Sequence, residues 1–159
     1  MSPCLLVPSL LPRAYTTQNA TQMIELKTRE IDQLVRAAVE ARDQAYAPHS
    51  HFYVGAALWI PSGTIVSGCN VENASYSLSI CAERVATSTA VSQGHRAFQA
   101  IAIASVGGVS PCGACRQFLS EFAGDMQVIM ADVLTGARQI RRLSQLLPDA
   151  FDASNLPVT

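Results

Sequence analysis

The chain has 159 residues, the usual length of one domain, so a second full domain is not expected. Hydrophobic residues make up 49% and charged residues 14%, which supports a sizeable core and excludes a disordered chain. Eleven Lys and Arg residues against twelve Asp and Glu residues give a net charge of −1. A protein that holds a phosphate backbone needs a basic surface, so this balance disfavours nucleic acid as a partner.

The start of the chain differs in character from the rest. Residues 1–21 contain three prolines and show no sustained periodicity, so we expect them to be a disordered N-terminal extension and residues 22–159 to form a single domain. A secretory signal needs a basic residue ahead of its apolar segment, and none precedes Arg13. No apolar run approaches the roughly 18 residues of a membrane span. We therefore expect a cytoplasmic protein with no membrane partner.

The next part of the chain predicts a helix followed by a hairpin. Apolar residues at positions 31–39 recur at the spacing of one helix face, which predicts an amphipathic helix over residues 22–45. Two apolar runs at 52–60 and 64–69 are joined by a Pro-Ser-Gly turn, which predicts two strands of a hairpin. The polar segment 70–79 is expected to be a loop.

The second half alternates between helical and strand patterns. Ser110 and Pro111 favour a helix start, because Ser suits the N-cap and Pro suits the first helical position. The expected elements are a helix at 80–93, a strand at 98–105, a helix from about 110 to 122, strands at 127–131 and 138–141, and a helical turn at 143–147. This order predicts an α/β fold, with a mixed five-stranded sheet in a three-layer α/β/α domain.

Cysteines carry the strongest chemical signal. The chain has five, an odd number that argues against a disulfide framework and for metal or catalytic use. Cys112 and Cys115 lie three residues apart on the first turn of a predicted helix, a spacing at which both sulfurs can reach one zinc ion. By itself this pair would fit a redox motif or two core cysteines equally well.

A third cysteine favours a metal site over a redox motif or two core cysteines. Cys81 also begins a predicted helix, and the positive partial charge of a helix N-terminus stabilises the thiolate that binds metal. No fourth ligand is evident, since Cys4 lies in the extension and Cys69 ends a strand, where a small buried hydrophobe is expected. Three protein ligands with an open position describe a catalytic site. We predict one Zn²⁺ per subunit, held by Cys81, Cys112 and Cys115.

Glu83 is the candidate catalytic residue, because it follows Cys81 by two positions and is not needed as a ligand. A carboxylate beside a catalytic zinc can move protons, whereas the alternative role is simply to complement the helix dipole. Three thiolates leave the site negatively charged, and Arg84 or Arg116 could offset this by hydrogen bonds to the sulfurs.

The segments 81–84 (CAER) and 111–117 (PCGACRQ) resemble the signature of the zinc-dependent cytidine deaminases. The likeness continues through 52–58 (FYVGAAL) and 68–76 (GCNVENASY), and it covers roughly residues 31–151. A cysteine as first ligand and the loop at 68–76 are similar to the free-nucleoside, homotetrameric branch of the superfamily. The fold that the resemblance implies is the cytidine deaminase-like fold.

The resemblance implies an enzyme of pyrimidine salvage, a zinc hydrolase acting on a small-molecule nucleoside. It would convert cytidine and 2′-deoxycytidine to uridine and 2′-deoxyuridine, with release of ammonia. Two alternatives are a same-fold deaminase acting on another aminopyrimidine, such as a nucleoside antibiotic or a polynucleotide, and a catalytically silent zinc-binding module. The near-neutral charge and the presence of both Asn70 and Glu72 argue against the first, and Glu83 argues against the second.

Substrate contacts also follow from the resemblance. Phe52 would pack against the pyrimidine ring, and Asn70 and Glu72 would be buried polar groups that hydrogen-bond the ribose hydroxyl. The amide of Ala82 and carbonyls near Ser110 would read the base edge.

Two further residues, Tyr76 and Phe151, resemble residues that a neighbouring subunit of a homotetramer contributes to the pocket. The low charge content agrees with surface buried between subunits. His49 and Tyr53 depart from the family's usual residues near the pocket mouth, which leaves the breadth of substrates open.

Overall fold

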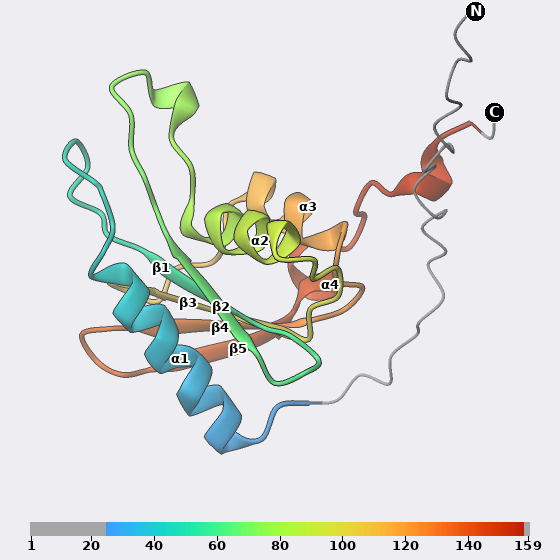
Figure 1. Ribbon diagram of the computed structural model, residues 1–159, viewed down its shortest axis with the longest axis horizontal. Helices are drawn as coiled ribbons and strands as arrows, with labels where there is room; N and C mark the ends of the chain where they lie inside the picture. Colours follow the sequence, from blue (N-terminus) through green and yellow to red (C-terminus); the bar gives the residue numbers. More distant parts are fainter. Residues whose placement is uncertain (1–24, 158–159) are drawn as a thin grey trace, which may run out of the picture.

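The computed structural model describes residues 25–157, so the extension predicted at 1–21 lies outside the described residues. Its elements follow the predicted order (Figure 1). They are α1 (Thr28–Arg42), β1 (Gly55–Trp59), β2 (Ile65–Cys69), the 3₁₀ turn η1 (Tyr76–Leu78), α2 (Ala82–Ser92), β3 (Ala100–Ser105), α3 (Gly113–Ser120), β4 (Gln127–Asp132), β5 (Arg138–Arg142), α4 (Leu143–Leu146) and the 3₁₀ turn η2 (Ala153–Asn155). Among residues 25–157, no helix has both the length and the apolar character that crossing a membrane requires.

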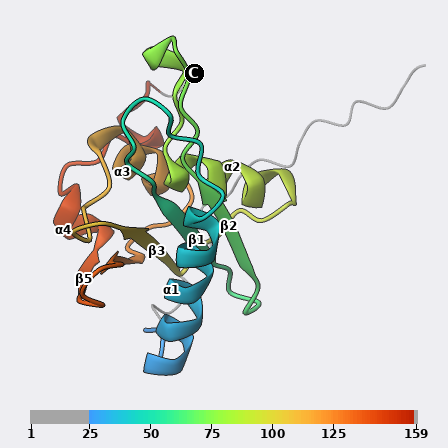
Figure 2. The same cartoon turned by 90° about the vertical axis from the view of Figure 1, so that its left-hand side faces the viewer.

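The predicted mixed five-stranded sheet is confirmed, with the strand order β2-β1-β3-β4-β5. Only β3 and β4 run parallel, and the other neighbouring pairs are antiparallel. Helix α1 covers one face, while α2 and α3 lie together on the other, so the domain has three layers (Figures 1 and 2). Both helices that begin at predicted zinc ligands are therefore on the same side of the sheet.

The core is divided between the two faces by the alternation along the central strands. Leu58 and Ile103 pack in the cluster under α2 and α3, whereas Ala57 and Ala102 pack under α1. Strand β3 is buried along its whole length, as a central strand covered on both faces should be.

The helices are shorter than predicted, and the starts of α1 and α3 differ most clearly for a physical reason. Helix α1 begins at Thr28 rather than residue 22, where the Glu30 carboxylate accepts from the Lys27 amide at 2.6 Å and caps the first turn. Helix α3 begins at Gly113 with Cys112 as N-cap, two residues later than predicted. The Arg116 guanidinium explains this shift, because it donates to the Pro111 carbonyl at 2.8 Å and to Ser110 Oγ at 3.0 Å, contacts that hold 110–111 outside the helix.

Candidate active site

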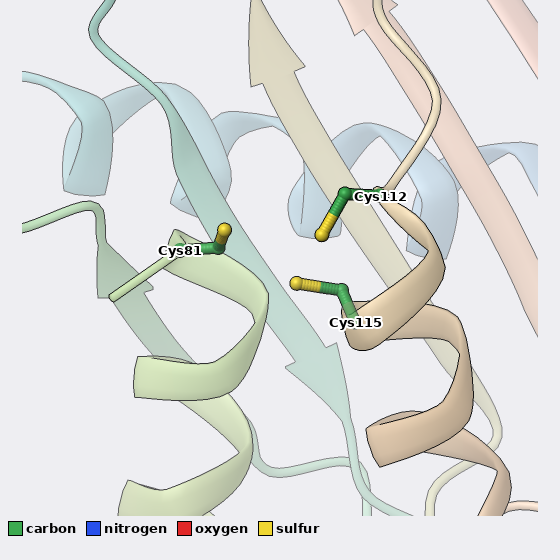
Figure 3. Close-up of side chains that lie close together, drawn as sticks. All are labelled: Cys81, Cys112 and Cys115. Carbon is green, nitrogen blue, oxygen red and sulfur yellow. The ribbon is translucent and has the colours of Figure 1, made fainter. Parts of the chain in front are cut away.

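The ends of α2 and α3 bring three cysteines together. Cys81 is the N-cap of α2, Cys112 is the N-cap of α3, and Cys115 lies on the first turn of α3. Their sulfur atoms all lie within 4.8 Å of one another and point into the space between the two helix ends (Figure 3). Cysteines separated by 31 residues of sequence thus meet because both helices pack side by side on one face of the sheet.

The surroundings of Cys81 favour negative charge. The pKa of Cys81 is lowered to about 5, because the Cys115 thiol donates a hydrogen bond to it and the Arg84 guanidinium acts in the same direction. The same hydrogen bond, together with burial, raises the pKa of Cys115. Arg84 Nη2 lies 4.0 Å from Cys81 Sγ and also donates to the Ser79 carbonyl at 3.2 Å. Of the two arginines considered from the sequence, Arg84 therefore reaches a sulfur, and Arg116 instead binds backbone and Ser110.

The three sulfurs fit a zinc ion. Tetrahedral zinc–thiolate sites have Zn–S bonds of about 2.3 Å and thus S···S separations of about 3.8 Å, which small side-chain rotations can reach from the observed spacing. Within residues 25–157, these cysteines form the one group of at least three His, Cys, Asp or Glu side chains close enough to share an ion. A three-sulfur donor set leaves a fourth position for another ligand.

Glu83 lies beside this group, in the first turn of α2, and only 5% of it is exposed. Burial raises the pKa of its carboxyl, and the negative charge of Cys81 adds to the effect. A glutamate that served only to complement the helix dipole would gain by remaining in water. A buried carboxyl with a raised pKa is instead suited to accepting and releasing protons.

A pocket opens next to Cys81 and contains several of the predicted substrate residues. Its lining consists of Ser50, Phe52, Asn70, Val71, Glu72, Ser79, Ile80 and Cys81. Phe52, Asn70 and Glu72 therefore share one pocket with a zinc ligand. Ala82 is adjacent, and as the first residue of α2 its amide lies in the turn whose N–H groups have no intrahelical partner.

Asn70 and Glu72 are half-buried in the isolated chain, not buried as predicted, because both face the open pocket. Asn70 Oδ1 accepts from the Val54 amide at 2.8 Å, and its Nδ2 donates to the Phe52 carbonyl at 2.9 Å. Glu72 Oε2 accepts from the His49 amide at 2.8 Å. Each side chain retains hydrogen-bonding capacity for a ligand, since an amide offers four bonds and a carboxylate about four.

Tyr76 and Phe151, the residues expected from a neighbouring subunit, do not line this pocket in their own chain. Tyr76 is 73% exposed, and its ring lies against that of His49 with the centroids 5.7 Å apart. Phe151 is 58% exposed, while its backbone is held by the Gln117 side chain, which donates to the Phe151 carbonyl at 2.7 Å.

Sequence reasoning missed part of the lining and misjudged one cysteine. Ser50, which lines the pocket, lies two residues before Phe52, and this proximity was the one signal that could have marked it. Cys69 is half-buried rather than buried, because its thiol reaches out of the end of β2 to donate to the Gln44 carbonyl at 3.3 Å.

Comparisons with known proteins agree with this geometry. The family model for the cytidine and deoxycytidylate deaminase zinc-binding region matches residues 28–131. A cytidine deaminase from Sporosarcina psychrophila is 44% identical over 129 residues, covering 80% of this chain and 95% of the relative. The crystal structure of a cytidine deaminase from Burkholderia pseudomallei is 45% identical, with a TM-score of 0.73 over 76% of this chain and 98% of that one.

Fold and site together define a zinc-dependent hydrolase of the α/β class. The chain belongs to the cytidine and deoxycytidylate deaminase family, so the predicted family, fold and zinc cofactor are confirmed. A more distant relative, a blasticidin-S deaminase from Bacillus cereus, is 31% identical over 137 residues, covering 77% of this chain and 96% of that protein.

The site predicts a defined metal content. Purified protein should contain about one zinc per chain, and Cys112→Ser should reduce that content, since it removes one of the three sulfurs. The matched control is Cys69→Ser, which changes a thiol outside the cluster and should leave zinc unaltered. Elemental analysis after gel filtration measures the zinc per chain in the wild type and in the two variants. Equal zinc in the Cys112 and Cys69 variants would contradict the assignment.

Proposed function

We propose that this chain catalyses the hydrolytic deamination of cytidine and 2′-deoxycytidine to uridine and 2′-deoxyuridine. One water is consumed, a C4–O bond forms, the C4–N bond breaks, and ammonia leaves. The observation that carries the proposal is the buried Glu83 carboxyl beside three cysteines that converge next to a pocket containing Phe52, Asn70 and Glu72.

Cys81, Cys112 and Cys115 would hold the metal in this scheme. Zinc held there would supply Lewis-acid activation of the attacking water. Glu83 accepts one proton from the attacking water and delivers it to ring N3, and it then takes the second proton from the new C4 hydroxyl and passes it to the departing amino group. Its raised pKa supports this role, because a carboxyl that titrates closer to neutrality can both take up and release a proton during one turnover.

The pocket walls have separate tasks in the proposed complex. Phe52 packs against the pyrimidine ring, while Asn70 and Glu72 hydrogen-bond the ribose. The Ala82 amide and carbonyls near Ser110 contact the base edge. A site with several polar groups directed at one ligand discriminates strongly against analogues that leave those groups unpaired, so we expect free cytosine to be a poor substrate.

The proposal includes assembly into a homotetramer in which Tyr76 and Phe151 of one subunit complete the pocket of another. Three observations support it: both aromatic rings are largely exposed, the segment bearing η1 projects beyond the sheet (Figure 1), and only 14% of residues are charged. Cytoplasmic localisation and a place in pyrimidine salvage belong to the same proposal. The four cysteines among residues 25–157 are all free thiols, which suits a reducing compartment.

A nucleoside antibiotic carrying an aminopyrimidine is the second candidate substrate, on the strength of the blasticidin-S deaminase relative. Its identity of 31% against 44% for the cytidine deaminase favours cytidine. Ammonia release measured with cytidine, 2′-deoxycytidine, cytosine, single-stranded DNA and blasticidin S decides between them. We expect the two nucleosides to react fastest, and a preference for any of the other three would overturn the proposal.

Replacing Glu83 tests the proton transfer. Glu83→Gln should lower the turnover number for cytidine by at least about 10²–10⁴-fold, the usual contribution of general acid–base catalysis, because the amide cannot take up the proton. Zinc should remain bound, since all three thiolates are retained. Glu40→Gln, at an exposed position of α1, is the matched control and should keep full activity. Normal turnover in a zinc-loaded Glu83→Gln preparation would refute the mechanism.

The assembly predicts that a residue far from the zinc motifs affects turnover. Phe151→Ala should lower kcat/KM for cytidine, because the neighbouring pocket loses an aromatic wall, while zinc content stays the same. Leu134→Ala removes a side chain of similar exposure, 74%, in the turn between β4 and β5, and serves as the comparison. Light scattering gives the mass of each assembly. A fully active monomer would contradict the shared pocket.

A further inference from the structure

Ser50 lines the pocket and makes three hydrogen bonds to Glu72 and Phe52. Its hydroxyl donates to Glu72 Oε1 and accepts from the Phe52 amide at 3.0 Å, and its own amide donates to Glu72 Oε2 at 3.2 Å. One side chain thus joins the carboxylate proposed to bind the sugar to the backbone of the aromatic residue proposed to bind the base. Its single proton is directed at Glu72.

The Glu72 carboxylate is held by donors from one loop. Besides the two groups of Ser50, the His49 amide donates to Oε2 at 2.8 Å. The Glu72 backbone is fixed as well, because its amide donates to the Tyr46 carbonyl at 2.8 Å. These donors favour the ionised form, and the Ser50 hydroxyl makes the largest contribution to lowering the pKa of Glu72. An ionised carboxylate can only accept, so its remaining lone pair is available to a donor such as a sugar hydroxyl.

The loop that contains His49 and Ser50 has an uncommon backbone conformation at the next residue, His51. His51 has φ of 56°, in the left-handed region that non-glycine residues seldom occupy, and its amide donates to the Ala47 carbonyl at 3.0 Å. This turn directs the Phe52 amide back toward Ser50 Oγ. A strained conformation at a pocket wall is typical of segments that fix the position of ligand-binding groups.

We infer that Ser50 is the positioning residue for sugar recognition: it holds the Glu72 carboxylate where a ribose hydroxyl donates to it. This inference rests on the proposed function, in which the ligand is a pyrimidine nucleoside. Ser50 would act on the sugar through Glu72, so its effect should be largest with substrates that carry the ribose hydroxyls.

The experiment compares cytidine with 2′,3′-dideoxycytidine, which lacks both ring hydroxyls of the ribose. Ser50→Ala should raise KM for cytidine about tenfold to a hundredfold, the usual effect of losing a hydrogen bond to a charged group, with a smaller change in kcat. The kcat/KM for the dideoxy compound should fall much less, by no more than the lost contact with the Phe52 amide contributes. Ser50→Thr, which keeps the hydroxyl, should restore cytidine turnover. Ser62→Ala, in the turn between β1 and β2, is the control and should behave as wild type.

Two further variants extend the experiment. Ser50→Cys keeps the size of the side chain but has a weaker donor, so it should lower kcat/KM for cytidine less than Ser50→Ala does. It takes the place of Ser50→Ala if that variant does not fold. In the double variant Ser50→Ala/Glu72→Ala, the loss should be no greater than in Glu72→Ala alone. Equal losses on both substrates, or no loss, would overturn the inference and leave the proposed function standing. Wild-type protein inactive on every nucleoside would overturn both.

Discussion

The meeting of two helix N-termini on one face of the sheet is the constraint on which the site depends. The sulfurs at these two ends converge within 4.8 Å, and no single segment of the chain supplies all three. The positive ends of both helices favour the thiolate form, and Arg84 adds a full positive charge next to Cys81. Zinc binding in this family member is therefore a property of tertiary packing, since separation of α2 from α3 would leave a two-cysteine motif and an isolated thiol.

The position of α2 is fixed by close contact with β2. A Cβ at Gly68 would lie 2.5 Å from the Ala86 amide nitrogen, so only glycine lets the helix approach the strand this closely. That approach places the start of α2 against the sheet, where Ala82 and Glu83 are buried. The chain continues from the end of β2 directly into Asn70 and Glu72. The contact between β2 and α2 therefore fixes the positions of the metal ligand Cys81, the proton carrier Glu83 and one wall of the pocket relative to one another. Catalytic groups in such an arrangement need little rearrangement when a ligand binds.

Local sequence signals predicted the order of helices and strands, and the combination of Cys81 with the Cys112–Cys115 pair predicted the metal cluster. Features that depend on distant contacts could not be read in this way. The N-cap of α3 is Cys112 rather than Ser110 because the Arg116 guanidinium holds the preceding residues outside the helix. For Ser50 the sequence offered only its nearness to Phe52, since its partner Glu72 lies 22 residues further along the chain and meets it only after folding.

The coordination of the bound metal tests the central claim most directly. X-ray absorption spectroscopy at the zinc edge, on the purified full-length protein, counts the sulfur ligands and measures their distance. The three converging thiols predict three sulfurs at about 2.3 Å with one lighter oxygen or nitrogen ligand, the pattern of an open catalytic site. Four sulfurs would indicate a closed structural site that recruits another cysteine, and two or fewer would show that the two helix ends do not share the ion. Either result would contradict the account.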